Sequence, residues 1–240
     1  MIREAIQEIE KLAKPTVQEF GGLTYTNRPF IPVKDPMPDG ENVTTLSGLV
    51  ELVRAKLNGL DVARAYALVE SPTRVTVSML LCNVWGDRQT HITCELPSYG
   101  AFPFGRYMEQ EEFMIGLQAF FVRGEEEADS SYVVEIAGKL TASDVKQSND
   151  DGISQNVVIK KGPVLQADVV VKKLVKLRPY RTFREIVQPA SEFVFRMRSR
   201  QNEVPALALH VADAEMWQPE AMRTIKAFIE KELPDLTVVA

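Results

Sequence analysis

The stretch RVTVSMLLCNVWGDRQTHITCEL, from Arg74 to Leu96, decides the fold class of this chain. Its two halves have strand-like composition, and Gly86-Asp87 lies between them, a pair that suits tight turns with glycine first. If Trp85 pairs with Arg88, the numbers of paired residues sum to 173. The stretch therefore predicts an antiparallel hairpin, the starting unit of a largely antiparallel sheet.

This register places the two cysteines on opposite faces of the hairpin. Cys82 would lie opposite His91, and Cys94 would lie opposite Met79. Side chains on opposite faces of a sheet point away from each other, so we predict that both cysteines are unpaired. A thiol beside an imidazole also suggests zinc, but two ligands do not make a zinc site, and we predict no metal.

Helical and strand patterns share the rest of the chain. Apolar residues recur at helical spacing in segments that predict helices over Ile2–Lys14, Leu46–Leu57, Tyr107–Val122 and Pro219–Leu233. Other segments predict strands over Tyr132–Leu140, Val157–Lys161, Ala167–Arg184, Glu192–Arg198 and Leu236–Val239. We expect a single α+β domain over residues 1–240, with a largely antiparallel sheet and packed helices that include a C-terminal one.

A proline-rich arm interrupts this pattern at residues 29–39. It holds Pro29, Pro32, Pro36 and Pro38. Proline donates no backbone N–H and has a fixed φ, so the segment can be neither a helix nor a central strand. We expect an extended arm, and because such arms often pack on a neighbouring subunit, it favours a homo-oligomer.

Positive charge is concentrated between Val169 and Arg200. This stretch holds nine lysine and arginine residues against Glu185 and Glu192, a net charge of +7. The whole chain of 240 residues has a net charge of −5, so the remainder carries −12. Such separation indicates either an anionic partner or self-association between a basic and an acidic face.

The two strand-like runs of this basic stretch alternate between apolar and polar residues. Burying the apolar side of each run turns the arginines outward. If the runs pair through the loop around Pro189, their exposed faces form one surface, the predicted phosphate-binding site, with Arg178, Tyr180, Arg184, Arg196 and Arg198. Arginine forks with an interleaved aromatic ring suit phosphate contacts and base stacking. The alternative is that these arginines pair with the acidic surface of the same or an adjacent subunit.

No catalytic pattern accompanies these residues. His91 and His210 lie in different predicted strands, and the sequence has no GxSxG, GxGxxG or P-loop motif. Glu109 and Glu112 could act as paired acids, but no histidine at metal-ligand spacing lies near them. We expect a protein that is not an enzyme and has no cofactor. The sequence also lacks a signal peptide and a stretch of ~18 apolar residues, so we expect a cytoplasmic location and no membrane partner.

The run LRPYRTFREIVQPASEFVFR, from Leu177 to Arg196, resembles the C-terminal signature of the YfdQ-like family of phage and prophage proteins. Met108–Phe113 resembles that family's glutamine-acid-phenylalanine helix start, and Trp217–Leu233 resembles its terminal segment. The resemblance covers about half of the chain, from about Leu96 onward. It implies a bacteriophage accessory protein, and it implies no activity and no catalytic residues.

These observations lead to two expected functions. The first is an oligomeric, non-catalytic phage or prophage accessory protein that binds a phosphate-bearing ligand, either nucleic acid or a nucleotide signal sequestered against host defence. The second is a self-assembling scaffold whose basic strand contacts the acidic surface of a neighbouring subunit. An enzyme without a visible motif is a third possibility. A continuous basic track would favour nucleic acid, a closed pocket would favour a nucleotide, and arginines consumed in salt bridges would favour a scaffold.

Overall fold

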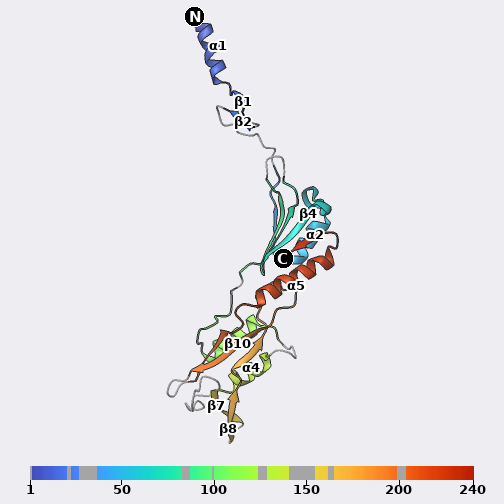
Figure 1. Cartoon of the computed structure of the whole chain (residues 1–240). Helices are drawn as coiled ribbons and strands as arrows, with labels where there is room; N and C mark the ends of the chain where they lie inside the picture. Colours follow the sequence, from blue (N-terminus) through green and yellow to red (C-terminus); the bar gives the residue numbers. More distant parts are fainter. Residues whose placement is uncertain are drawn as a thin grey trace. The chain divides into compact units, whose positions relative to one another are not determined.

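A computed structural model describes residues 2–20, 23–26, 37–82, 87–98, 100–123, 129–140, 155–161, 165–198 and 204–240 (Figure 1). The chain divides into two compact units, Met1–Met37 and Pro38–Ala240. The first unit contains helix α1 (Ile2–Ala13), as predicted, and the antiparallel strands β1 (Val17–Phe20) and β2 (Leu23–Thr26). The predicted proline-rich arm lies outside the described residues as far as position 36.

A mixed five-stranded sheet of order β12-β4-β5-β6-β3 forms the first part of the second unit. Its strands are β3 (Glu41–Val43), β4 (Ala65–Ser71), β5 (Arg74–Met79), β6 (Thr90–Glu95) and β12 (Thr237–Val239). β4, β5 and β6 are antiparallel neighbours, whereas β12 is parallel to β4 and β3 is parallel to β6. Helices α2 (Leu46–Arg54) and α5 (Trp217–Glu232) pack against this sheet around one apolar core (Figure 1).

The start of α2 follows from its sequence. The Thr45 side chain accepts a hydrogen bond from the Gly48 N–H at 3.1 Å, so Thr45 is the N-cap of the helix. The helix ends at Arg54 rather than near Leu57, and two short 3-10 turns follow, Leu57–Gly59 and Val62–Arg64. The second predicted helix is therefore confirmed but shorter.

The predicted hairpin of β5 and β6 is antiparallel, but its predicted register is wrong. Val75 pairs with Cys94 and Val77 pairs with Ile92, so paired numbers sum to 169 rather than 173. Cys94 thus lies opposite Val75, not Met79. This register buries apolar residues against one another, and the connection between the strands is longer than a two-residue turn because β5 ends at Met79 and β6 begins only at Thr90. The two registers differ by an even number of residues, so each side chain keeps its face, and what changes is which apolar residues pair across the strands.

Both cysteines are free, as predicted. Cys82 is exposed and lies outside the strands, so it does not face His91 across the sheet. Cys94 is buried in β6.

An antiparallel three-stranded sheet forms the second part of this unit, with β10 (Ser191–Arg198) between β9 (Leu174–Leu177) and β11 (Ala206–Val211). Helices α3 (Gln110–Phe120) and α4 (Ser130–Gly138) share its core, which is rich in phenylalanine. Strands β7 (Gln155–Lys161) and β8 (Leu165–Val171) form a separate antiparallel pair. The α+β class and the C-terminal helix are therefore confirmed.

Two predicted strands of this part differ in the structure. Tyr132–Leu140 is helical, because Val133, Ile136 and Ala137 recur at helical spacing and are all buried. The predicted strand Ala167–Arg184 is divided into β8 and β9 and ends at Leu177.

The residues from 178 to 190 form a loop that connects the two cores. Phe183 and Ile186 are buried in the core of the five-stranded sheet. Leu177 and Phe193, on either side of the loop, are buried in the core of the three-stranded sheet. This loop contains most of the run on which the family resemblance rests.

Candidate phosphate-binding site

Strand β10 presents its arginines as the sequence predicts. Phe193, Phe195 and Met197 are buried in the core, so the alternation of the strand places Arg196 and Arg198 on the opposite face. β10 also pairs with β9, as expected for the two basic runs. Two of the five predicted site residues therefore share one open sheet face.

The other three predicted residues lie in the loop after β9. Arg178 follows that strand directly, and its carbonyl accepts the Val122 N–H at 2.9 Å. The guanidinium carbon of Arg184 lies 4.5 Å from the centre of the Tyr180 ring. Arg184 and Tyr180 thus form a cation–π pair at the surface of the loop.

This loop pair lies far from the end of β10. Leu177 pairs with Ser191, so the loop leaves the sheet at the Ser191 end of the strand. Arg198 is seven residues further along, about 23 Å at ~3.3 Å per residue. The predicted surface is therefore divided into two places, one at Arg184 and one at Arg198.

Arg198 contacts an aromatic ring on the far side of β11. Its guanidinium carbon lies 4.4 Å from the centre of the Tyr107 ring. Arg198 pairs with Ala206 across one side of β11, and Met108 bridges to Leu207 across the other side. The arginine side chain therefore crosses a whole strand to reach the tyrosine.

Small side chains on β11 make this crossing possible. Leu207 and Leu209 are buried in the core, so Ala206 and Ala208 alternate onto the open face. Ala208 is 0% exposed although it does not belong to that core. Larger side chains must therefore cover Ala208, and its small methyl side chain leaves room for Arg198 to lie across the strand.

A hollow of about 550 Å³ opens beside this pair. Tyr107 and Arg198 line it together with Glu109, Gln110 and Glu111 at the start of α3. The Glu109 side chain does not cap the helix, so the N–H groups of the first turn lack that partner. Such N–H groups and the positive end of the helix dipole attract anions.

The hollow is mixed in charge. Arg198 is exposed and positive, whereas Glu109 and Glu111 are exposed carboxylates. Carboxylates disfavour a bare phosphate but accept hydrogen bonds from hydroxyl and amino groups. The arrangement suits a ligand that has an anionic group, hydrogen-bond donors and a flat ring.

Sequence reasoning missed two aromatic side chains at this place. Tyr107 is one, and His210 is the other, with its ring centre 6.1 Å from that of Tyr107 in an edge-on arrangement. The alternation of Ala206, Ala208 and His210 along β11 is a signal that a larger group covers the strand. It does not say which distant segment supplies that group.

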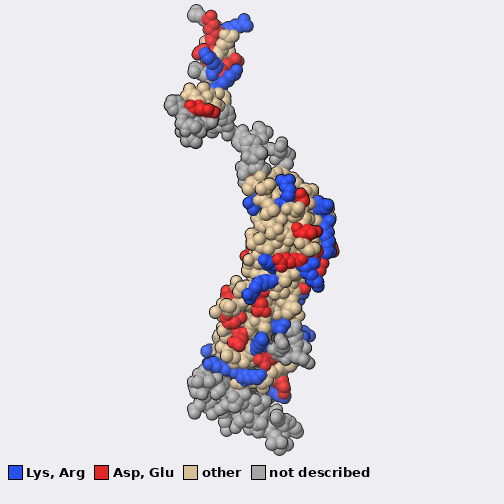
Figure 2. Space-filling view, turned by 45° about the vertical axis from the view of Figure 1, so that its right-hand side comes forward, with Lys and Arg blue, Asp and Glu red and all other residues tan. Residues whose placement is uncertain are grey.

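Another cation of the basic stretch, Lys172, has a partner within the chain. The Lys172 ammonium lies 2.9 Å from Asp129 Oδ1, and the backbone N–H of Lys176 donates to Asp129 Oδ2 at 2.9 Å. Burial alone would raise the pKa of Asp129, but the hydrogen bonds from Lys176 and Lys172 hold it below its usual value. In the view of Figure 2, positive and negative side chains of the described residues are interspersed on the second unit, and those residues form no continuous positive track on this face.

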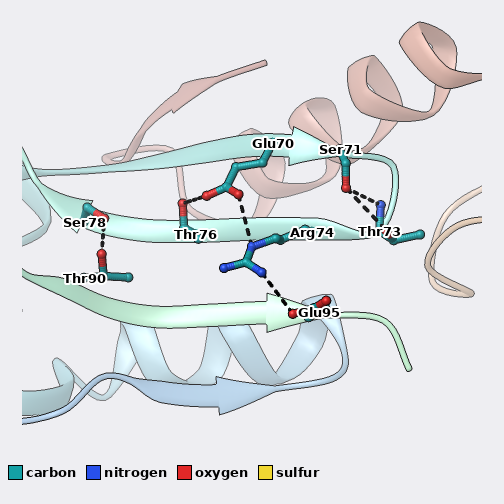
Figure 3. Close-up of polar contacts among 8 residues, drawn as sticks. All are labelled: Glu70, Ser71, Thr73, Arg74, Thr76, Ser78, Thr90 and Glu95. Carbon is teal, nitrogen blue, oxygen red and sulfur yellow. Dashed lines mark hydrogen bonds and ion pairs between the residues drawn. The ribbon is translucent and has the colours of Figure 1, made fainter. Parts of the chain in front are cut away.

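A second polar arrangement lies on the five-stranded sheet, on the side away from its helices (Figure 3). Arg74 Nε is 3.1 Å from Glu70 Oε2, and Arg74 Nη1 donates to Glu95 Oε2 at 3.2 Å. The Thr76 hydroxyl donates to Glu70 Oε1 at 2.8 Å. These contacts link β4, β5 and β6 across the sheet, so they support strand pairing, and we assign no ligand to them.

Comparison of the chain with protein family models, with curated proteins and with solved structures finds no match. Within the described ranges, no group of three or more histidine, cysteine, aspartate or glutamate side chains could hold a metal ion. None of the described helices has both the length and the apolar composition needed to cross a membrane.

Proposed function

We propose that the protein is a non-catalytic, oligomeric accessory protein of a phage or prophage that binds a phosphate-bearing ligand of nucleotide size in the hollow beside Tyr107 and Arg198. The observation that carries the proposal is the Arg198 guanidinium 4.4 Å from the Tyr107 ring, in a hollow that the residues at the start of α3 also line. The guanidinium and the helix N–H groups would contact phosphate. The aromatic group would take part in stacking with a base.

The mixed charge of the hollow favours a nucleotide over nucleic acid. A nucleic-acid track needs several aligned cations, because each neutralised phosphate adds to the affinity and to its salt dependence. Here Glu109 and Glu111 stand beside Arg198. A nucleotide offers one anionic group to the arginine and hydroxyl or amino donors to the carboxylates. The volume of about 550 Å³ lies in the range of small-molecule sites.

Ligand retention and titration test this function. Native mass spectrometry of the purified protein should show a retained nucleotide, and calorimetry should identify its class from mononucleotides, dinucleotides and cyclic nucleotides. Arg198→Ala should weaken binding at least about 10-fold, the usual size of a charge-assisted contact. Tyr107→Leu should weaken it by about 5- to 100-fold through loss of stacking.

Arg184→Ala is the matched control. It removes the same kind of cation–π pair, with Tyr180 at 4.5 Å, but at the other place. Binding should be unchanged. If Arg184→Ala abolishes binding and Arg198→Ala does not, the ligand site is the loop. If neither nucleotides nor a single-stranded oligonucleotide binds the wild type, the proposal fails.

The scaffold alternative keeps one supporting observation. Asp129 is the last residue of the acidic run at 125–129, and its carboxylate accepts hydrogen bonds from the Lys172 ammonium and from the backbone N–H of Lys176 in the basic stretch. Acidic and basic segments of this chain are thus complementary, and copies could use the same complementarity. A scaffold would show assembly that dissolves with salt and would retain no nucleotide.

A further inference from the structure

Helix α1 presents a row of isoleucines to solvent. Ile2, Ile6 and Ile9 are 80%, 51% and 65% exposed. Every side chain of α1 whose burial is described is exposed, so within its own unit the helix packs its apolar side against nothing described. A helix of 12 residues is marginal in water without packing. We therefore expect the apolar side of α1 to pack against a partner.

The spacing of this row is that of a two-helix seam. Ile2, Ile6, Ile9 and Ala13 follow one another at intervals of four, three and four residues. This is the a and d pattern of a heptad repeat, in which apolar residues of two helices interlock. A helix that lies on a membrane would instead carry a polar face rich in lysine and arginine. Residues 2–14 contain three basic and three acidic residues, so their net charge is zero.

The flanking charges match a second copy in the antiparallel direction. In this heptad Ile2 and Ile9 occupy d positions. Arg3 and Glu10 follow them directly, so both occupy e positions on the same side of the seam. In an antiparallel pair e positions face e positions, so Arg3 of each copy meets Glu10 of the other. In a parallel pair these residues do not meet. The row then matches itself, with Ile6 against Ile9 and Ile2 against Ala13.

We propose that α1 is a self-association helix that packs antiparallel against α1 of a second copy of this chain. The inference rests on α1 alone and is independent of ligand binding. It gives the expected homo-oligomer a defined contact surface.

Light scattering of the full chain tests the proposal. The wild type at tens of micromolar should have at least twice the monomer mass of 26.9 kDa. The double variant Ile6→Glu, Ile9→Glu should weaken association at least about 10-fold, because it places charges in an apolar seam. The control variant Gln7→Glu, Lys11→Gln makes the net charge more negative by the same amount, but at positions away from the seam. It should leave the measured mass unchanged.

A charge exchange tests the antiparallel direction with variants that keep the apolar row. Arg3→Glu should weaken association by about 3- to 10-fold, because two ion pairs become repulsive. Adding Glu10→Arg should restore the wild-type affinity. A monomeric wild type, or an unchanged mass in the double isoleucine variant, would overturn the proposal. So would an exchange that restores nothing, and so would α1-dependent binding to phosphatidylglycerol vesicles without self-association.

Discussion

The guanidinium carbon of Arg181 lies 4.2 Å from the centre of the Trp217 ring, so a cation of the loop after β9 stacks on the first residue of α5. The same guanidinium donates a hydrogen bond to the Ser191 hydroxyl. Burial lowers the pKa of Arg181 to about 10, while the charges of Asp213 and Glu215 oppose this effect. Arg181 thus stays protonated at neutral pH and ties the loop to α5 from within.

We expect Arg181→Ala to lower the free energy of unfolding by about 2–3 kcal/mol, because it removes a partly desolvated cation–π contact and a hydrogen bond and leaves a void. Arg181→Lys should recover less than half, since an ammonium cannot stack flat on the indole. Urea unfolding followed by tryptophan fluorescence measures both effects.

Arg184→Ala is the control, because Arg184 stacks on Tyr180 at an exposed position. It should cost less than about 1 kcal/mol. Equal losses for the two variants would show that Arg181 is not an internal link.

Gln188 holds the same loop from its buried centre, with 4% of its surface exposed. Its Oε1 accepts the N–H groups of Arg181 and Thr182 at 3.2 and 3.4 Å. Its Nε2 donates to the carbonyls of Phe183 and Ile186 at 2.9 and 3.2 Å. One side chain therefore satisfies four backbone groups that a tight loop leaves without partners.

We expect Gln188→Ala to cost about 3 kcal/mol or more, because backbone groups lose their partner where water has little access. Gln188→Glu should be at least as harmful, since a carboxylate cannot donate to the two carbonyls. Gln218→Ala, at a less buried site, should have little effect. Thermal unfolding checks all three, and a Gln188→Ala variant as stable as the wild type would contradict this role.

The fold could be predicted wherever one short segment contains the whole signal. The isoleucine row of α1, the Thr45 cap of α2 and the alternation of Phe193 and Phe195 in β10 each needed only local information. The register of β5 and β6 depends on which apolar residues pair across the two strands and on a connection longer than two residues. The Gly86-Asp87 pair predicted a two-residue turn and therefore the wrong register. The segment around Val133 is rich in β-branched residues, and its helical spacing was outweighed by that propensity.

The candidate site was predicted only in part, for a related reason. The outward direction of Arg196 and Arg198 follows from strand alternation. The partner of Arg198, Tyr107, comes from a segment 91 positions earlier in the chain that reaches β11 through the Met108 bridge. No local pattern reports such a contact. Arg181 was counted only in the net charge of the basic stretch, and charge alone does not distinguish an internal arginine from an external one.

Cys94 is expected to make stability depend on alkaline pH. It is 0% exposed, and burial raises the pKa of its thiol from 9.0 to about 12, with a smaller contribution from the charge of Glu185. Between these values the unfolded chain loses a proton that the folded chain keeps. The contribution of Cys94 is therefore complete below pH 9 and is lost as the pH rises, by up to about 1.4 kcal/mol per pH unit.

Urea unfolding gives the free energy of unfolding of the wild type and of Cys94→Ala over this pH range. The difference between the two proteins isolates the contribution of Cys94, because lysines and tyrosines titrate alike in both. The wild type should lose stability faster. Iodoacetamide at neutral pH should modify the exposed Cys82 in the folded protein and reach Cys94 only after unfolding. Identical slopes in the two proteins would contradict the burial argument.

Variants of Asp129 test whether the acidic and basic segments contact each other within one chain or between copies. Its carboxylate accepts from the Lys172 ammonium and the Lys176 N–H, both at 2.9 Å, and these bonds lower its pKa against the effect of burial. Its stabilisation should therefore be complete above the ordinary pKa of 3.8 and should disappear as the pH falls below it.

We expect Asp129→Asn to cost about 1 kcal/mol at neutral pH, because an amide cannot accept both hydrogen bonds as a carboxylate does. At strongly acidic pH the two proteins should unfold alike. If Asp129→Asn instead leaves unfolding unchanged and reduces the mass measured by light scattering, the contact belongs between copies, and the scaffold function gains over ligand binding.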